Sequence, residues 1–69
     1  MREYEIWMDK AICQEGVYPA RELGRYEAKS FQEACKLMLM DHPEFNGYYS
    51  EEYNSIWGCR LFYMDKKYV

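Results

Sequence analysis

Cysteine and histidine are the residues of this sequence best suited to metal or nucleophilic chemistry. Three cysteines and a single histidine formally make a Cys3His set for tetrahedral zinc. These residues are Cys13, Cys35, His42 and Cys59. The cysteines lack the closely spaced C-x2-4-C pair typical of zinc sites, and Cys35 falls on the apolar stripe of a predicted helix. We therefore predict no metal site and expect reduced, mostly buried thiols.

A catalytic pair of cysteine and histidine would need the two side chains in hydrogen-bond contact. His42 follows Cys35 by seven positions, which places both on one helix face but roughly 10 Å apart along its axis. Neighbouring carboxylates such as Glu51 and Glu52 occur, yet no feature of the sequence marks a pocket that would separate their pKa values. The sequence therefore predicts a protein that is not an enzyme and uses no cofactor.

A stretch rich in tyrosine and acids, in the second half of the chain, has the composition of a binding surface. No lysine or arginine lies between Leu37 and Cys59, and carboxylates gather there. Aromatic rings are enriched at protein interfaces, and a negative surface favours a basic partner. The predicted contact residues are Trp7, Glu44, Tyr48, Tyr49, Glu51, Glu52, Tyr53 and Arg60. The alternative, that Phe45, Tyr49 and Tyr53 cover the core as a lid, stays open.

Other classes of partner find less support in the composition. The chain has 69 residues and a net charge of −3, without the clustered lysines and arginines on which nucleic-acid affinity rests. Its longest apolar run, residues 37–40, is too short to cross a bilayer. The sequence does not open on a basic stretch followed by an apolar run, so we predict a cytoplasmic protein. A nucleic-acid or membrane partner is not expected, and a homodimer stays open.

Strands and one helix must position these candidate residues. Residues 4–9 alternate apolar and polar side chains, which is typical of a half-buried strand. Residues 10–22 predict a long connection with a turn near Glu15-Gly16, and residues 23–28 predict a second strand. Residues 55–64, rich in aromatic and branched side chains, predict a last strand that is apolar on both faces.

The helix has clear start and stop signals. Ser30 and Glu33 have the spacing of a capping box, which satisfies two backbone N–H groups at a helix start. Pro43 disfavours helical geometry at the preceding residue, so the helix should end at Asp41 or His42. Its apolar stripe consists of Phe31, Ala34, Cys35 and Met38.

The order strand, strand, helix, strand predicts one small α+β domain over residues 1–69. With a right-handed crossover, the first strand lies between the other two, which gives a three-stranded antiparallel sheet of order 2-1-3 with the helix on one face. The opposite face would carry Trp7 and part of the last strand. We expect this open face to be closed by residues 45–53, by a second subunit or by a partner.

Four segments carry a resemblance to a family of very small bacterial and phage-type proteins. They are YEIWM at residues 4–8, FxEAC at residues 31–35, the pair Tyr48-Tyr49, and SIWGCRLF at residues 55–62. The resemblance implies a small α+β domain and supplies no catalytic residue. The chain departs from the family pattern after residue 9, where it lacks a run rich in glycine and serine.

Together, these patterns predict a non-enzymatic module for protein interaction. A phage or mobile-element origin would favour an inhibitor of a host defence protein, comparable to an anti-CRISPR protein, that contacts a basic surface. The alternative is a sponge for a small nucleotide or metabolite at a dimer interface, with Arg25 and Arg60 beside stacked rings.

Overall fold

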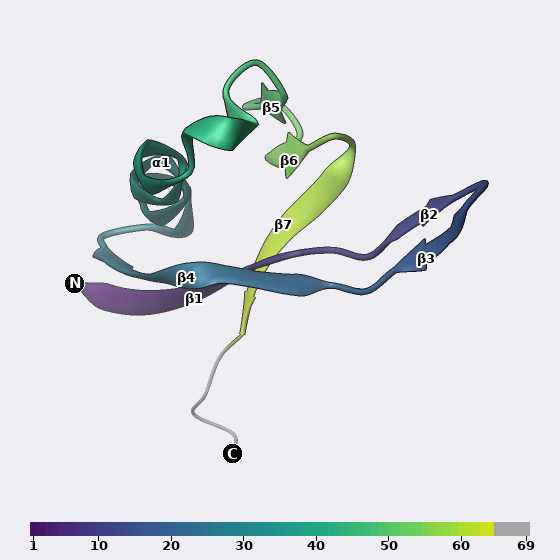
Figure 1. Cartoon of the computed structure of the whole chain (residues 1–69). Helices are drawn as coiled ribbons and strands as arrows, with labels where there is room; N and C mark the ends of the chain where they lie inside the picture. The colour runs from purple at the N-terminus through teal and green to yellow at the C-terminus, as the bar shows by residue number, and fades with distance from the viewer. Residues whose placement is uncertain (65–69) are drawn as a thin grey trace.

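The computed structural model describes residues 1–64, which form short strands, an α-helix and a 3-10 helix (Figure 1). In chain order the elements are β1 (Arg2–Met8), β2 (Ala11–Cys13), β3 (Gly16–Tyr18), β4 (Arg21–Ala28), α1 (Phe31–Asp41), η1 (Pro43–Phe45), β5 (Tyr49–Ser50), β6 (Ser55–Ile56) and β7 (Cys59–Met64). Within these residues no helix has the length and apolar character needed to cross a membrane.

The strands form two antiparallel sheets. The larger sheet has five strands in the order β4-β1-β7-β6-β5, and the smaller one pairs β2 with β3. In the larger sheet, Arg2 of β1 lies opposite Ala28 of β4, and Met8 of β1 lies opposite Leu61 of β7. The predicted three-stranded sheet with one helix in the order β-β-α-β is therefore wrong. Two segments of the chain account for the difference.

The first segment is residues 10–22, which were predicted to be a long connection. They form a hairpin, here called the β-arm, in which Ala11 pairs with Tyr18 and Cys13 pairs with Gly16. Figure 1 shows the β-arm as a thin extension of the β1–β4 ribbon. Each of its strands has three residues, and none of these residues is buried. Because a strand without a buried face needs no alternation of apolar and polar side chains, the sequence did not indicate these strands.

The second segment is residues 55–64, which were predicted to be one continuous strand. The chain reverses at Trp57 and Gly58, so that β6 and β7 form a hairpin in which Ile56 pairs with Cys59. The backbone φ is +53° at Trp57 and +78° at Gly58. Positive φ at both central residues is the requirement of a type I′ turn, whose twist matches that of the flanking strands. This turn adds β6, and with it β5, to the sheet.

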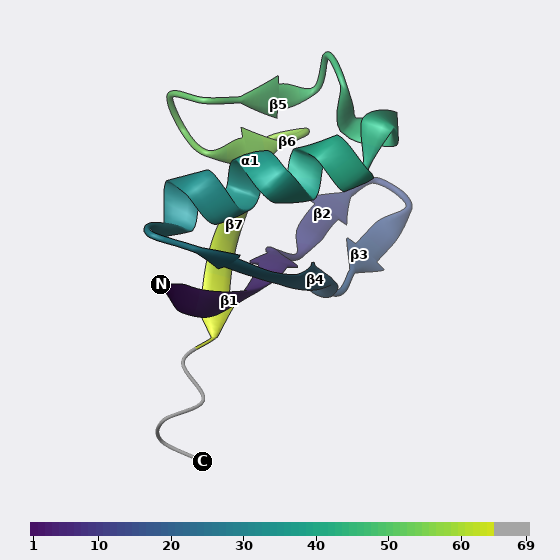
Figure 2. The ribbon, with the colours of Figure 1, turned by 90° about the vertical axis from the view of Figure 1, so that its left-hand side faces the viewer.

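The prediction of the helix is confirmed. The hydroxyl of Ser30 accepts a hydrogen bond of 3.2 Å from the backbone N–H of Glu33, and α1 ends at Asp41, before Pro43. The Glu33 carboxylate in turn accepts from the backbone N–H of Lys29 at 3.1 Å, so both side chains cap the helix. Figure 2 shows α1 lying across one side of the sheet, next to the β5–β6 hairpin.

The core lies on the helix side of the sheet. Its fully buried side chains are Ile6, Ala34, Cys35, Met38, Phe45 and Ile56. Phe45 comes from η1 and Ile56 from β6, so the segment after the helix covers the same side as the helix itself. Of the three expected ways to close the opposite face of the sheet, closure by residues 45–53 is therefore wrong, and closure by a second subunit or a partner stays a prediction. That face carries the half-buried rings of Trp7 and Phe62.

A β-bulge in β4 shapes the sheet edge next to the end of α1. Ile6 pairs with Gly24 and Trp7 pairs with Glu22, which leaves Leu23 without a cross-strand partner. The bulge turns the Leu23 side chain into the core, where it is 4% exposed. It also requires a φ of +128° at Gly24, a value that only glycine adopts readily.

Candidate binding site at the Trp57 turn

Trp57 combines an exposed ring with a left-handed backbone. The residue is 53% exposed at the tip of the β6–β7 hairpin, and its φ is +53°. For a bulky residue this region of φ is unfavourable by about 1–2 kcal/mol, whereas asparagine would form the same turn readily. Strained positions of this kind cluster at functional sites. The combination makes Trp57 the first candidate for a binding residue.

Two rings from the preceding segment hold the indole of Trp57. Phe45 contacts it edge-to-face, with 5.3 Å between ring centroids, and Tyr48 contacts it at 5.5 Å. The backbone N–H of Trp57 also donates to the carbonyl of Tyr48 at 3.2 Å. These contacts fix the ring on one side and leave its other side facing a groove.

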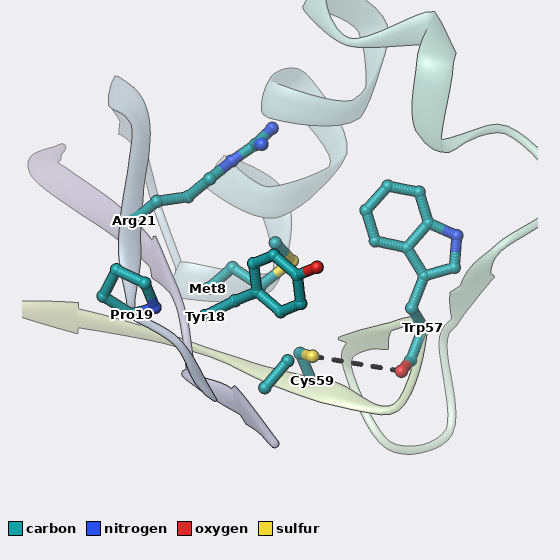
Figure 3. A pocket seen from close by; sticks show the side chains of 7 residues that line it. Met8, Tyr18, Pro19, Arg21, Trp57 and Cys59 are labelled. Carbon is teal, nitrogen blue, oxygen red and sulfur yellow. Dashed lines mark hydrogen bonds between the residues drawn. The ribbon is translucent and has the colours of Figure 1, made fainter. Parts of the chain in front are cut away.

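The groove lies between the Trp57 turn and the base of the β-arm, and has a volume of about 420 Å³ (Figure 3). Residues that line it include Met8, Tyr18, Pro19, Arg21, Trp57 and Cys59. Figure 3 shows the indole of Trp57 across the groove from Arg21 and Pro19. A mostly apolar lining with one charged group is the usual composition of a site for a small ligand.

Arg21 supplies the charge of this lining. Its guanidinium carbon lies 5.5 Å from the centroid of the Phe45 ring, within the range of a cation–π contact. Among residues 1–64, no carboxylate lies within the 4.0 Å that defines an ion pair with Arg21. Arg21 is therefore oriented by a ring and has N–H groups left to donate.

His42 connects the end of α1 to the bulge in β4, beside the groove. Its Nδ1 lies 2.9 Å from Oε2 of Glu44, its Nε2 lies 2.9 Å from the carbonyl oxygen of Leu23, and its ring stacks on Phe45 at 5.5 Å. Both partners are acceptors, so both contacts are hydrogen bonds when each ring nitrogen carries a proton. The hydrogen bond from His42 is the main cause that lowers the pKa of Glu44, and the charge of Arg21 adds to it.

Stability should depend on Glu44 in a way that changes with pH. Because the pKa of Glu44 is lowered by folding, its carboxylate stabilises the fold above the ordinary glutamate pKa of about 4.3, and this contribution is lost as pH falls through the folded-state pKa. Glu44→Gln should lower the urea midpoint at about pH 6, and this loss should shrink steadily as pH falls below the ordinary glutamate pKa of about 4.3. Equal losses at about pH 6 and about pH 3 would contradict this account.

The control for this experiment is Glu52→Gln. The Glu52 side chain is exposed and makes no hydrogen bond or ion pair with the part of the chain that is described. We expect the urea midpoint of this variant to equal that of the unchanged protein at both pH values.

The predicted tyrosines divide into packed and exposed rings. Tyr48 is 57% exposed and Tyr53 is 71% exposed, at opposite ends of the β5–β6 hairpin. Tyr49 is half-buried, and its hydroxyl donates to Oδ1 of Asn54 at 2.7 Å. The amide of Asn54 in turn donates to the buried thiol of Cys35 at 3.6 Å. Tyr49 therefore packs on the core, whereas Tyr48 and Tyr53 are accessible to a partner.

Trp7 and Arg60 lie on the face of the sheet opposite α1. The indole N–H of Trp7 donates to Glu5 at 2.8 Å, and Arg25 pairs with the same carboxylate at 3.0 Å. Arg60 lies 3.9 Å from a carboxylate oxygen of Asp9. The structure does not bring Trp7 or Arg60 together with the exposed tyrosines. The nucleotide sponge would use Arg25 and Arg60, and each of these arginines already has an acidic partner, Glu5 and Asp9 respectively.

The predicted acids Glu44, Glu51 and Glu52 are all exposed. Glu51 reaches Nζ of Lys36 only at 4.0 Å, and an exposed pair at this distance contributes little. No lysine or arginine occurs between residues 37 and 59, so the basic groups near these acids come from other parts of the chain: Lys36 lies beside Glu51, and the charge of Arg21 acts on Glu44.

The predicted contact set omits the groove residues Tyr18, Arg21 and Trp57. One signal for Trp57 was present, because a two-residue X-Gly loop between short apolar runs is typical of a hairpin. No pattern indicated that the β-arm would lie beside this turn, since the arm has no buried face.

The three thiols should react at very different rates. Cys13 is exposed and Cys59 half-buried, whereas Cys35 is fully buried, and its burial raises the thiol pKa despite the hydrogen bond from Asn54. With excess thiol reagent in native buffer, we expect Cys13 to react first, Cys59 next, and Cys35 on the order of 10²-fold more slowly than Cys13. Cys13→Ser should remove the fast phase, and all thiols should react together in urea. Fast labelling of Cys35 in the native protein would contradict the packing described.

The structure keeps the chemically reactive side chains apart. Cys13 lies on the β-arm, Cys35 in α1 and Cys59 at the start of β7. Among residues 1–64, no group of three or more histidine, cysteine or acidic side chains could hold a metal ion. No protein-family model, curated protein or solved structure matches the chain.

Proposed function

We propose that this chain is a non-enzymatic protein-binding module that contacts a basic surface of its partner. Its contact surface, here called the aromatic edge, consists of Tyr48, Tyr53 and Trp57. The observation that carries the proposal is Trp57, whose ring is 53% exposed although its backbone is in the left-handed region. A smaller residue would form this turn more favourably, so a function in contact with a partner accounts for the tryptophan.

The chemistry of the aromatic edge supports binding to protein. Tryptophan and tyrosine are the side chains most enriched among residues that dominate binding energy, because each buries a large area at a low cost in side-chain entropy. Tyr48 packs against Trp57 at 5.5 Å, so the two rings form one rigid contact area before any partner arrives. A preformed area loses less entropy on binding than separate mobile rings would.

The charge around the aromatic edge supports a basic partner. Glu44 lies before Tyr48 in the chain, and Glu51 and Glu52 lie beside Tyr53, without a lysine or arginine in the same segment. A patch of one sign accelerates association with a patch of the opposite sign and disfavours other partners. Together with the resemblance to small phage-type proteins, this supports a cytoplasmic inhibitor that covers the basic groove of a host defence protein.

The test is capture of a partner by the tagged protein from a bacterial lysate, followed by measurement of affinity with the purified partner. The variant Trp57→Asn with Tyr48→Ser keeps the type I′ turn and should weaken binding by about 30-fold or more. Reversing the charge of Glu51 and Glu52 to lysine should slow association, and raising the salt concentration should slow the association of the unchanged protein.

The control is Ile12→Ser, which changes a residue of the β-arm that is 74% exposed and is not part of the aromatic edge. We expect this variant to bind as the unchanged protein does. Equal capture by the Trp57/Tyr48 variant, or equal losses for both variants, would refute the aromatic edge as the contact surface. A second copy as the partner would appear as a dimer in analytical ultracentrifugation, with the same dependence on Trp57.

A further inference from the structure

We propose that the groove beside Trp57 is a binding site for a small planar aromatic carboxylate. The inference goes beyond the proposed protein-binding function. Both use Trp57, but this site uses the side of the indole that faces the β-arm together with Arg21, and it involves neither Tyr53 nor the acids. Its elements are the two aromatic side chains Tyr18 and Trp57, an apolar floor and the side chain of Arg21.

The size and lining of the groove fit a compact ring system. Its volume of about 420 Å³ lies in the range of sites for small ligands, which is roughly 300–1,000 Å³. Met8 and Pro19 contribute apolar surface. The ring of Tyr18 and the indole of Trp57 line the same groove (Figure 3). Flat rings favour flat ligands, because offset stacking and edge contacts both need a planar partner.

Arg21 specifies the charge of the ligand. Its guanidinium is held over the Phe45 ring at 5.5 Å, and no acid of residues 1–64 forms an ion pair with it. The nearby carboxylate of Glu44 is engaged by His42 at 2.9 Å. An oriented guanidinium matches the two oxygens of a carboxylate in a bidentate contact.

A single arginine also limits the class of ligand. Polyphosphates and nucleic acids need several cations to offset their charge, and Arg21 is the one cation of this lining. A neutral aromatic molecule would make no ion pair with the guanidinium. One carboxylate on one ring system therefore satisfies both features of the groove.

The experiment follows the two indole N–H signals of the isotope-labelled protein by NMR. The probe is indole-3-acetate at natural isotope abundance, and its uncharged match is indole-3-acetamide. The carboxylate should shift the Trp57 signal with a dissociation constant of roughly 1 mM, and the amide should bind about tenfold more weakly. The Trp7 signal, from the opposite face of the sheet, should not move.

Two arginine variants decide the role of Arg21. Arg21→Gln should weaken binding of indole-3-acetate about tenfold and leave indole-3-acetamide unchanged. Arg25→Gln, which removes an arginine already paired with Glu5, should change neither. Equal affinity for the two probes, equal shifts of both indole signals, or no shift up to about 10 mM would overturn the proposal. Since Arg21 is not part of the aromatic edge, such a result leaves the capture experiment unaffected.

Discussion

Replacing Phe45 by alanine should destabilise the protein by about 3–5 kcal/mol, a larger loss than we expect for any other change proposed for this chain. Phe45 is fully buried although it lies in a 3-10 helix of three residues. Its ring contacts His42 at 5.5 Å and Trp57 at 5.3 Å, and Arg21 lies over it. The side chain therefore joins the end of α1, the β6–β7 turn and β4. A domain of this size has a small stability margin, so the loss should unfold most of the population.

Urea unfolding followed by tryptophan fluorescence measures this effect. The matched control is Phe62→Ala, because Phe62 is half-buried on the open face of the sheet and should lose no more than about 1–2 kcal/mol. If the alanine variant does not fold, Phe45→Leu provides an intermediate, with an expected loss of about 1.5 kcal/mol. Similar midpoints for the Phe45 and Phe62 variants would contradict the role of Phe45 in the core.

The helix could be predicted from sequence because each of its determinants is local. The Ser30 cap, the apolar stripe and Pro43 all act within a few residues, and the structure places helix boundaries where these signals do. The strand β1 could also be predicted from local sequence, because its alternation of apolar and polar side chains reflects one buried and one open face.

The sheet could not be predicted because two turns override the apolar pattern. Residues 55–64 read as one strand, since the side chains on both sides of Trp57-Gly58 are apolar, and the reversal depends on two positive φ angles. For the β-arm the sequence indicated only the turn near Glu15-Gly16, because the side chains of its strands are exposed, and Figure 1 shows the arm continuing the β1–β4 ribbon. Both the reversal at Trp57-Gly58 and the β-arm therefore depend on contacts between segments that are distant in the sequence.

The candidate site was predicted only in part for the same reasons. Composition indicated the exposed rings Tyr48 and Tyr53, because the acidic segment was visible in the sequence. It could not separate them from Tyr49, whose hydrogen bond to Asn54 depends on the fold. Arg21 enters the site only because the β-arm and the Trp57 turn meet in space.

Gly24→Ala should destabilise the protein by about 2–4 kcal/mol, for two separable reasons. The first is backbone strain, because φ is +128° at Gly24 and a residue with a Cβ is strained there by about 1–3 kcal/mol. The second is a tight contact, since an added Cβ would lie 3.0 Å from Cε2 of Tyr26, and the ring would have to shift by a few tenths of an ångström. That ring cannot move away freely, because its hydroxyl donates to Asp41 at 2.9 Å. The bulge would have to rearrange, and with it the Leu23 carbonyl that contacts His42 at 2.9 Å.

Two further variants separate backbone strain from the contact with Tyr26: a control at another glycine, and Gly24→Ala in a protein that lacks the Tyr26 ring. Gly47→Ala introduces the same methyl group at a φ of +86°, where no atom of the described residues lies within 4 Å, so it should be unfavourable by only about 1 kcal/mol. In a Tyr26→Ser background this tight contact is absent, and the loss caused by Gly24→Ala should fall toward the backbone strain alone. Unfolding free energies from urea titration give both comparisons. If Gly24→Ala were no more destabilising than Gly47→Ala, the bulge would tolerate a side chain, and the fixed position of Leu23 and His42 would need another cause.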